Sequence, residues 1–176
     1  MLMPDRQVKD HEYFMQAALA EAGEALAAKE FPAGCVMVYH GKIMARGRRL
    51  NSSGAAINEM DHAEITALRE LITCFPAVNR AEIIVYSTME PCLMCFSTLL
   101  LNGIRAIVYA YEDPMGGGTD LTLSGLKPLY RQMEVTVIPH VRRSEGLKLF
   151  KQFFADSNNQ YWQKSLLAQY TLGQSD

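Results

Sequence analysis

The chain has 176 residues, of which 49% are hydrophobic and 20% are charged, and its formal net charge is −2. These values are typical of one globular domain with a substantial core, and a charge so close to zero gives no global electrostatic reason to expect a nucleic-acid partner. Because the sequence shows no secretory leader and no apolar run of membrane-spanning length, we expect a single domain over residues 1–176, without a membrane partner, in the cytoplasm.

Hydrophobic periodicity and turn residues predict alternating helices and strands along the chain. Apolar side chains at helical spacing predict a first helix over residues 8–29, which Pro32 and Gly34 then break. A tight antiparallel hairpin follows, with strands over 35–39 and 43–49. The remaining elements are predicted as a helix from 62, a strand over 82–88, a helix from 91, a strand over 104–110, a helix over 126–132, a strand over 134–138, and helices over 144–154 and 160–170.

The order of these elements predicts the fold class. The strand–helix–strand run over residues 82–110 should form a parallel, right-handed unit, whereas the earlier hairpin is antiparallel. Together they predict a mixed five-stranded sheet with helices on both faces, which is a three-layer α/β/α fold. In the helix that begins at residue 62, the side chains expected to face the core are Ile65, Leu68, Leu71 and Ile72.

Two short stretches carry the chemistry. Residues 61–64 read Asp-His-Ala-Glu, and residues 90–95 read Glu-Pro-Cys-Leu-Met-Cys. Zinc takes nitrogen and sulfur ligands in a tetrahedron, and a catalytic zinc keeps one position open for water. His62, Cys92 and Cys95 therefore make three candidate ligands, with Zn²⁺ as the cofactor. Both stretches lie at predicted helix starts, where backbone N–H groups favour negative charge and thiolates.

Glu64 is left free to move protons, because it follows the candidate histidine ligand by two residues and is not needed as a ligand. An open zinc position lowers the pKa of its bound water to about 7. A carboxylate beside that water can take its proton and pass it to a ring nitrogen and to a leaving amine. These residue types fit the hydrolytic deamination of a base, with release of ammonia.

Other interpretations explain less of the pattern. A structural zinc site usually has four protein ligands, and no fourth Cys or His stands at a suitable spacing, while a redox pair would not explain His62 or Glu64. A non-catalytic zinc scaffold would be expected to lack Glu64. An RNA-binding module should show a basic face, and only residues 46–49 approach one. This stretch is either a phosphate-binding patch or a solvated strand end. The glycines at 116–118 are expected to form a mobile loop, since no P-loop lysine accompanies them.

The pattern H-x-E…P-C-x-x-C is the signature of zinc-dependent base deaminases, and the chain resembles the cytidine/deoxycytidylate-type deaminase family. That family includes tRNA wobble adenosine, guanine and cytosine deaminases. The resemblance implies the cytidine-deaminase-like α/β/α fold and a homodimer. For Asn51 the resemblance implies a substrate hydrogen bond, although a turn residue explains it equally well. The other positions that the resemblance places at the substrate are Pro32, Gly34, the backbone of Ala63, Asp113 and Trp162.

The composition of the C-terminal tail bears on whether the substrate is RNA or a small molecule. The tRNA-editing branch of the family usually ends in a helix rich in lysine and arginine, but here the basic residues after 144 are offset by acidic ones. Because phosphate contacts dominate nucleic-acid affinity, a neutral tail disfavours RNA. The tail from about residue 144 is instead aromatic, and we expect a helical lid or interface in which Trp162 closes over a small base. We therefore expect a small nucleobase or nucleoside as the substrate, with a cytosine-, guanine- or adenine-type amine. The alternative is conversion of adenosine to inosine in tRNA.

Overall fold

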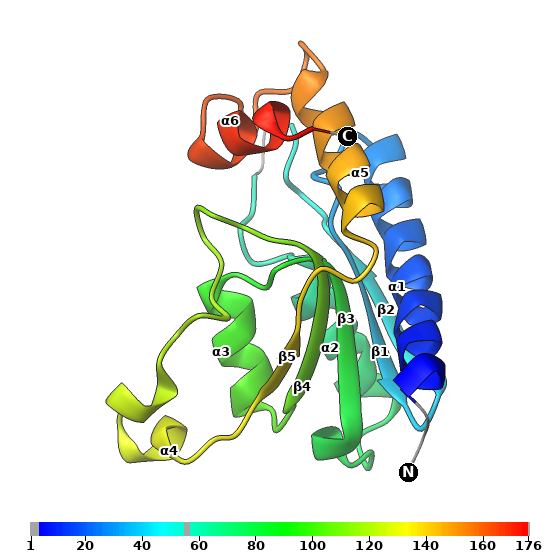
Figure 1. Ribbon diagram of the computed structural model, residues 1–176, viewed down its shortest axis with the longest axis vertical. Helices are drawn as coiled ribbons and strands as arrows, with labels where there is room; N and C mark the ends of the chain where they lie inside the picture. Colours follow the sequence, from blue (N-terminus) through cyan, green and yellow to red (C-terminus); the bar gives the residue numbers. More distant parts are fainter. Residues whose placement is uncertain (1–3, 55–56, 176) are drawn as a thin grey trace.

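The structure is a computed structural model, and it describes residues 4–54 and 57–175 (Figure 1). The described helices are α1 (Pro4–Ala27), α2 (Ala63–Cys74), α3 (Leu93–Leu101), α4 (Pro128–Arg131), α5 (Arg143–Ala155) and α6 (Leu166–Gly173). The described strands are β1 (Gly34–Tyr39), β2 (Lys42–Arg48), β3 (Ile83–Met89), β4 (Ala106–Tyr111) and β5 (Thr136–Ile138). None of the helices in these ranges is both long enough and apolar enough to cross a membrane.

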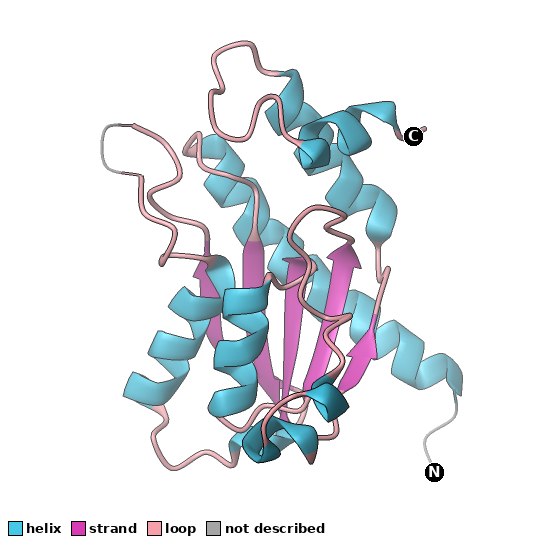
Figure 2. Cartoon of the chain, turned by 90° about the vertical axis from the view of Figure 1, so that its left-hand side faces the viewer, coloured by secondary structure: helices cyan, strands magenta, loops and turns pink. Residues whose placement is uncertain are grey.

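The strands form one mixed sheet in the order β2-β1-β3-β4-β5. β1 is antiparallel to both β2 and β3, whereas β3, β4 and β5 run parallel to one another. α2 and α3 cover one face of the sheet, and α1 covers the other face with α5 beside it (Figures 1 and 2). The predicted fold class, a three-layer α/β/α fold with a mixed five-stranded sheet, is therefore confirmed.

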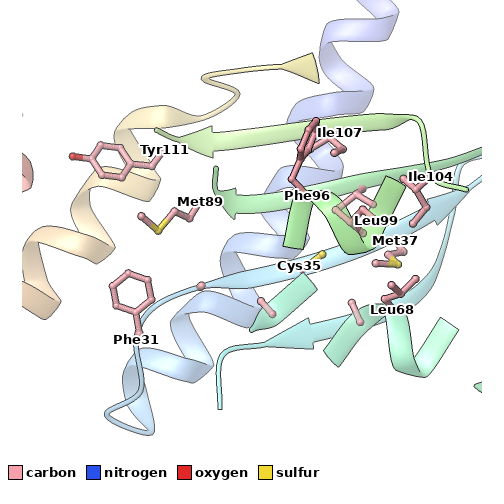
Figure 3. Packing of buried hydrophobic residues seen from close by; sticks show 14 of the residues in the cluster. Phe31, Cys35, Met37, Leu68, Met89, Phe96, Leu99, Ile104, Ile107 and Tyr111 are labelled. Carbon is pink, nitrogen blue, oxygen red and sulfur yellow. The ribbon is translucent and has the colours of Figure 1, made fainter. Parts of the chain in front are cut away.

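The two faces of the sheet bury different side chains because successive residues of a strand point in opposite directions. Met37 packs in the cluster under α2 and α3, whereas its neighbour Val36 packs under α1. Figure 3 shows part of the first cluster, including Met37, Leu68, Phe96, Leu99 and Ile107. Full burial of such a side chain contributes about 1.5–3 kcal/mol, so this packing holds the helices that carry the chemistry in fixed positions.

Two glycines set how closely the helices approach the sheet. A Cβ atom added at Gly34 would lie 2.2 Å from the carbonyl oxygen of Ala18 in α1. One added at Gly47 would lie 2.2 Å from the carbonyl oxygen of Ala63 and 2.5 Å from the amide nitrogen of Ala67, both in α2. The backbone of α2 therefore rests directly on β2, which fixes the first turn of α2 relative to the sheet.

The prediction for the last helix was wrong over residues 160–165, which form turns, and α6 begins only at Leu166. The side chain of Asn159 accepts a hydrogen bond from the amide of Tyr161 at 2.9 Å and donates one to its carbonyl at 3.2 Å. Such local side-chain bonds compete with a helix. Ile72 was also predicted to be buried but is 37% exposed, because the buried stripe of α2 runs through Ala67, Leu68 and Leu71.

Candidate metal and active site

Three ligand-type side chains converge where α2 and α3 begin. His62 is the N-cap residue of α2, Cys92 is the N-cap residue of α3, and Cys95 lies in the first turn of α3. Nδ1 of His62 lies 3.5 Å from the Sγ atom of each cysteine, and the three ligand atoms lie within 4.8 Å of one another. Tetrahedral bonds of about 2.1 Å to nitrogen and 2.3 Å to sulfur would put such atoms about 3.6 Å apart. The three side chains therefore fit one tetrahedral metal ion.

The cysteine pair holds a thiolate. A hydrogen bond from Cys95 is the largest cause that lowers the pKa of Cys92 to about 4, and the contact with His62 acts in the same direction, although burial opposes both. The same hydrogen bond, together with burial, raises the pKa of Cys95. These contacts favour a thiolate at Cys92, at a helix N-terminus where backbone N–H groups also favour it.

Glu64 lies beside this cluster without belonging to it. Its side chain is 5% exposed, its Oε1 accepts a hydrogen bond from the hydroxyl of Ser87 on β3 at 2.8 Å, and its Oε2 lies 3.5 Å from Sγ of Cys95. Burial raises the pKa of Glu64, and the charge of His62 opposes that rise only in part. A carboxyl group with a raised pKa, held next to metal ligands, is suited to general acid–base catalysis.

A cavity of about 260 Å³ lies in front of His62 and Glu64, at the carboxyl end of β3. Its lining includes the apolar side chains of Phe31, Met89 and Leu167, and Phe31 and Met89 lie near one another in Figure 3. The volume is slightly below the usual range for ligand pockets, which is about 300–1,000 Å³. The cavity therefore suits one small planar group better than a large ligand.

Two of the predicted substrate-contact residues line this cavity, namely Asp113 and Trp162. Oδ1 of Asp113 also accepts hydrogen bonds from the amides of Met115 and Gly116, at 2.9 and 3.0 Å, so Asp113 shapes the loop around the cavity. Trp162 is 45% exposed, which places it at the rim.

The other predicted contact residues are not part of the lining. Asn51 has a left-handed backbone, with φ of 55°, and its side chain donates to Oδ2 of Asp61 at 2.8 Å, as expected of a turn residue. Gly34 packs against α1, and Ala63 is buried where α2 contacts β2. Pro32 is buried between two residues that do line the cavity, so its segment contributes to the wall through its neighbours.

Hydrogen bonds hold the loop that contains the glycines at 116–118, whereas its sequence predicts a mobile loop. The buried carboxylate of Glu90 accepts hydrogen bonds from the amide of Asp113 at 3.1 Å and the amide of Thr119 at 3.3 Å. A Cβ atom added at Gly117 would lie 2.5 Å from that carboxylate, and one at Gly118 would lie 2.8 Å from the backbone of Leu93. The glycines therefore allow close packing beside the cysteines.

Two polar lining residues that sequence reasoning did not place at the cavity are Arg49 and Glu59. Within the basic stretch over 46–49, Arg46 and Arg48 pair with Glu21 and stay about half exposed, as a solvated strand end would, whereas the side chain of Arg49 is 2% exposed. One signal was available for Arg49. Positions 45, 47 and 49 alternate with exposed positions 46, 48 and 50, so Arg49 lies in the inward phase of the strand.

Residues 8–111 match the family model for the cytidine and deoxycytidylate deaminase zinc-binding region. The chain is 31% identical over 155 residues to a tRNA-specific adenosine deaminase of Agrobacterium fabrum, covering 84% of this chain and 95% of that protein. It is 30% identical over 148 residues to the tRNA-specific adenosine deaminase subunit tad2 of Schizosaccharomyces pombe, covering 84% of this chain but only 38% of that subunit.

Solved structures give the same result. A tRNA deaminase studied for A-to-I editing at the wobble position of transfer RNA superimposes with a TM-score of 0.66 at 27% identity, covering 78% of this chain and 98% of that chain. The protein NE0047 in complex with 2,6-diaminopurine superimposes with a TM-score of 0.66 at 20% identity, which supports the fold alone, and covers 85% of this chain and 84% of that chain. The chain therefore belongs to the cytidine and deoxycytidylate deaminase family, and its enzyme class is that of a hydrolytic deaminase acting on a nucleobase or nucleoside.

Proposed function

We propose that this chain is a zinc-dependent deaminase that converts adenosine to inosine in transfer RNA. The observation that carries the proposal is the 31% identity to the Agrobacterium fabrum tRNA-specific adenosine deaminase, because the match covers 95% of that protein. The sequence alone placed a free base or nucleoside first and tRNA second. The relatives support the tRNA alternative better, and we therefore place it first.

His62, Cys92 and Cys95 would hold the zinc ion, since their ligand atoms have tetrahedral spacing and the contacts of Cys92 favour a thiolate. A zinc ion bound there supplies a water activated at neutral pH. Glu64 is placed to take one proton from the attacking water and give it to the ring nitrogen. It would then move the remaining hydroxyl proton to the amino group, which leaves as ammonia. Ser87 keeps the Glu64 carboxylate oriented through its hydrogen bond to Oε1.

The rim of the cavity offers contacts that a nucleotide in a longer strand can use. Trp162 exposes its ring beside Lys164 and Gln163, and together they line a shallow hollow next to the cavity. An exposed aromatic face can stack on a neighbouring base, and a lysine can contact a phosphate. The target base would enter the cavity while its neighbours remain outside, as base-flipping enzymes require.

A free base or nucleoside is the second candidate substrate. Two observations favour it: the cavity has room for about one base, and Tyr161 and Trp162 of the tail both line it. In addition, two arginines at the start of α5 are already paired, Arg142 with Glu145 and Arg143 with Glu112. These two arginines are therefore less available to bind the phosphates of an RNA.

Deamination of two kinds of substrate separates the candidates. An anticodon stem-loop RNA with adenosine at the wobble position should yield inosine, and its turnover should fall steeply with salt because phosphate contacts release counterions. Free adenine, guanine, cytosine and their nucleosides should yield little ammonia. Turnover of a free base alone, without salt dependence, would replace the tRNA proposal with the second candidate. Inactive Glu64→Gln protein controls for contaminating deaminases. The homodimer and the cytoplasmic location stay predictions.

A further inference from the structure

One carboxylate oxygen of Glu59 contacts three side chains, two of them near in sequence and one in the C-terminal segment. Oε2 of Glu59 accepts hydrogen bonds from the hydroxyl of Tyr161 at 2.9 Å and from the guanidinium of Arg49 at 3.1 Å. The same oxygen lies 3.4 Å from Nε2 of His62. We infer that Glu59 is a positioning residue that couples closure of the C-terminal segment over the cavity to the orientation of the metal ligand His62.

The contact with His62 has the form of a carboxylate–histidine–metal arrangement. Nδ1 of His62 faces the sulfur atoms of Cys92 and Cys95, and Nε2 on the opposite side of the ring faces Glu59. A carboxylate in that position fixes the tautomer and the orientation of a histidine ligand, and it makes the ligand more basic. Glu59 therefore supports the nitrogen that His62 offers to a metal.

The contact with Tyr161 reaches the tail. Tyr161 lies in the turns before α6, its ring packs edge-on against Phe31 at 5.5 Å between centroids, and the next residue, Trp162, lies at the cavity rim. Residues 160–165 have neither helix nor strand bonding to hold them. Gln163 donates to the carbonyls of Phe154 and Asp156, and Arg49 lies 3.5 Å from the Tyr161 hydroxyl, so the segment has other contacts. The hydroxyl bond to Glu59 is the contact that links the Tyr161–Trp162 pair to His62.

Arg49 explains why the Glu59 carboxylate stays in place although its side chain is 55% exposed. The guanidinium of Arg49 is buried, and NH1 donates to the carbonyl oxygens of Leu50 and Asn58 at 2.8 and 2.6 Å. Nε of Arg49 has no hydrogen-bond partner among the described residues. A buried cation that loses its partner is strongly destabilising, so Glu59 cannot swing away freely. Arg49 thus holds the shared oxygen between His62 and Tyr161.

Coupling of this kind works in both directions, because linkage requires each site to affect the other equally in binding free energy. A metal ion that orders His62 also orders Glu59 and favours the closed tail. A closed tail in turn stabilises the metal ligand. The inference rests on the proposed metal site but not on which substrate is deaminated.

The chain carries its own reporter, because Trp162 is its one tryptophan. Zinc-loaded protein is mixed with a chromogenic chelator to measure the rate of zinc release, and acrylamide quenching of Trp162 fluorescence is measured with and without zinc. Substitution of such outer-shell partners typically costs about 10–100-fold in metal affinity, and we expect Glu59→Gln to show that loss as faster zinc release. Its Trp162 fluorescence should be quenched more readily and should no longer respond to zinc. Tyr161→Phe leaves the pairing of Arg49 with Glu59 intact and should still release zinc severalfold faster.

Matched controls use the same substitutions elsewhere. Glu82→Gln removes the carboxylate that pairs with the exposed His40. Tyr170→Phe removes a hydroxyl of the C-terminal tail that donates to the carboxylate of Glu112. Both control variants should release zinc at the parental rate.

The double variant Glu59→Gln/Tyr161→Phe tests whether the two residues act through the same connection. Its fold-increase in zinc-release rate should be smaller than the product of the fold-increases of the two single variants, because both substitutions remove one connection. Fully multiplicative effects, or release from Tyr161→Phe at the parental rate, would overturn the coupling. No substrate is used, so failure of the tRNA proposal would leave these results unchanged.

Discussion

Replacing Gly47 with alanine tests whether the position of the active site depends on close contact between α2 and β2. The added Cβ atom would lie 2.2 Å from the carbonyl oxygen of Ala63 and 2.5 Å from both the amide of Ala67 and Oγ1 of Thr66. Two of these three atoms belong to the backbone of α2 and cannot rotate away. Restoring an ordinary contact of 3.4 Å requires the first turn of α2 to move outward by about 1.2 Å.

The expected cost follows from that displacement. Overpacking of a close-packed interior typically costs 1–3 kcal/mol, and we expect about 3 kcal/mol because a helix backbone has to move. For a domain of this size, 1 kcal/mol corresponds to about 2–4 °C, so the melting temperature should fall by roughly 6–12 °C. His62 and Glu64 move with α2, whereas the cysteines stay on α3. Zinc affinity should therefore fall as well, because metal–ligand distances tolerate only about 0.2 Å.

Urea unfolding of the metal-free protein and a zinc titration measure the two effects separately. Gly23→Ala is the matched control, since a Cβ atom at this position in α1 would meet nothing within 4 Å. Alanine is favoured over glycine inside a helix, so this variant should gain about 0.5–1 kcal/mol. Gly47→Ala protein with the unfolding midpoint and zinc affinity of the parent would refute the idea that contact between α2 and β2 positions the site.

Three further predictions concern single side chains. Glu64→Gln should keep its zinc and lose at least about 10²–10⁴-fold in turnover, since the amide cannot shuttle a proton. Cys92→Ala should lose zinc by metal analysis, and equal zinc content would exclude Cys92 as a ligand. Hydrogen bonds from Arg143 and Tyr170 outweigh burial and lower the pKa of Glu112 from 4.5 to about 2. Glu112→Gln should therefore reduce the free energy of unfolding at pH 7, and the difference from the parent should shrink as the pH falls from 4.5 towards 2. A difference that grows in acid would contradict this assignment.

The sequence by itself was sufficient to select the three candidate metal ligands and to predict the order of most elements. His62, Cys92 and Cys95 could be identified because each motif is short, and because helix starts supply a local reason for the ligands to face one point. Periodicity in turn predicts strands and helices from neighbouring residues. The mixed sheet followed from the hairpin and the strand–helix–strand unit, since both connections constrain strand direction.

Only the tertiary structure showed what surrounds that cluster. Glu59 and Tyr161 are separated by 102 residues, and no spacing in the sequence links them. Gly34 resembles a pocket residue, yet its lack of a side chain serves the packing of α1. Asn51 resembles a substrate contact, yet its amide binds Asp61. Motif spacing reports on atoms within one turn or loop, whereas a cavity is lined by side chains from elements that meet only when helices and strands pack together.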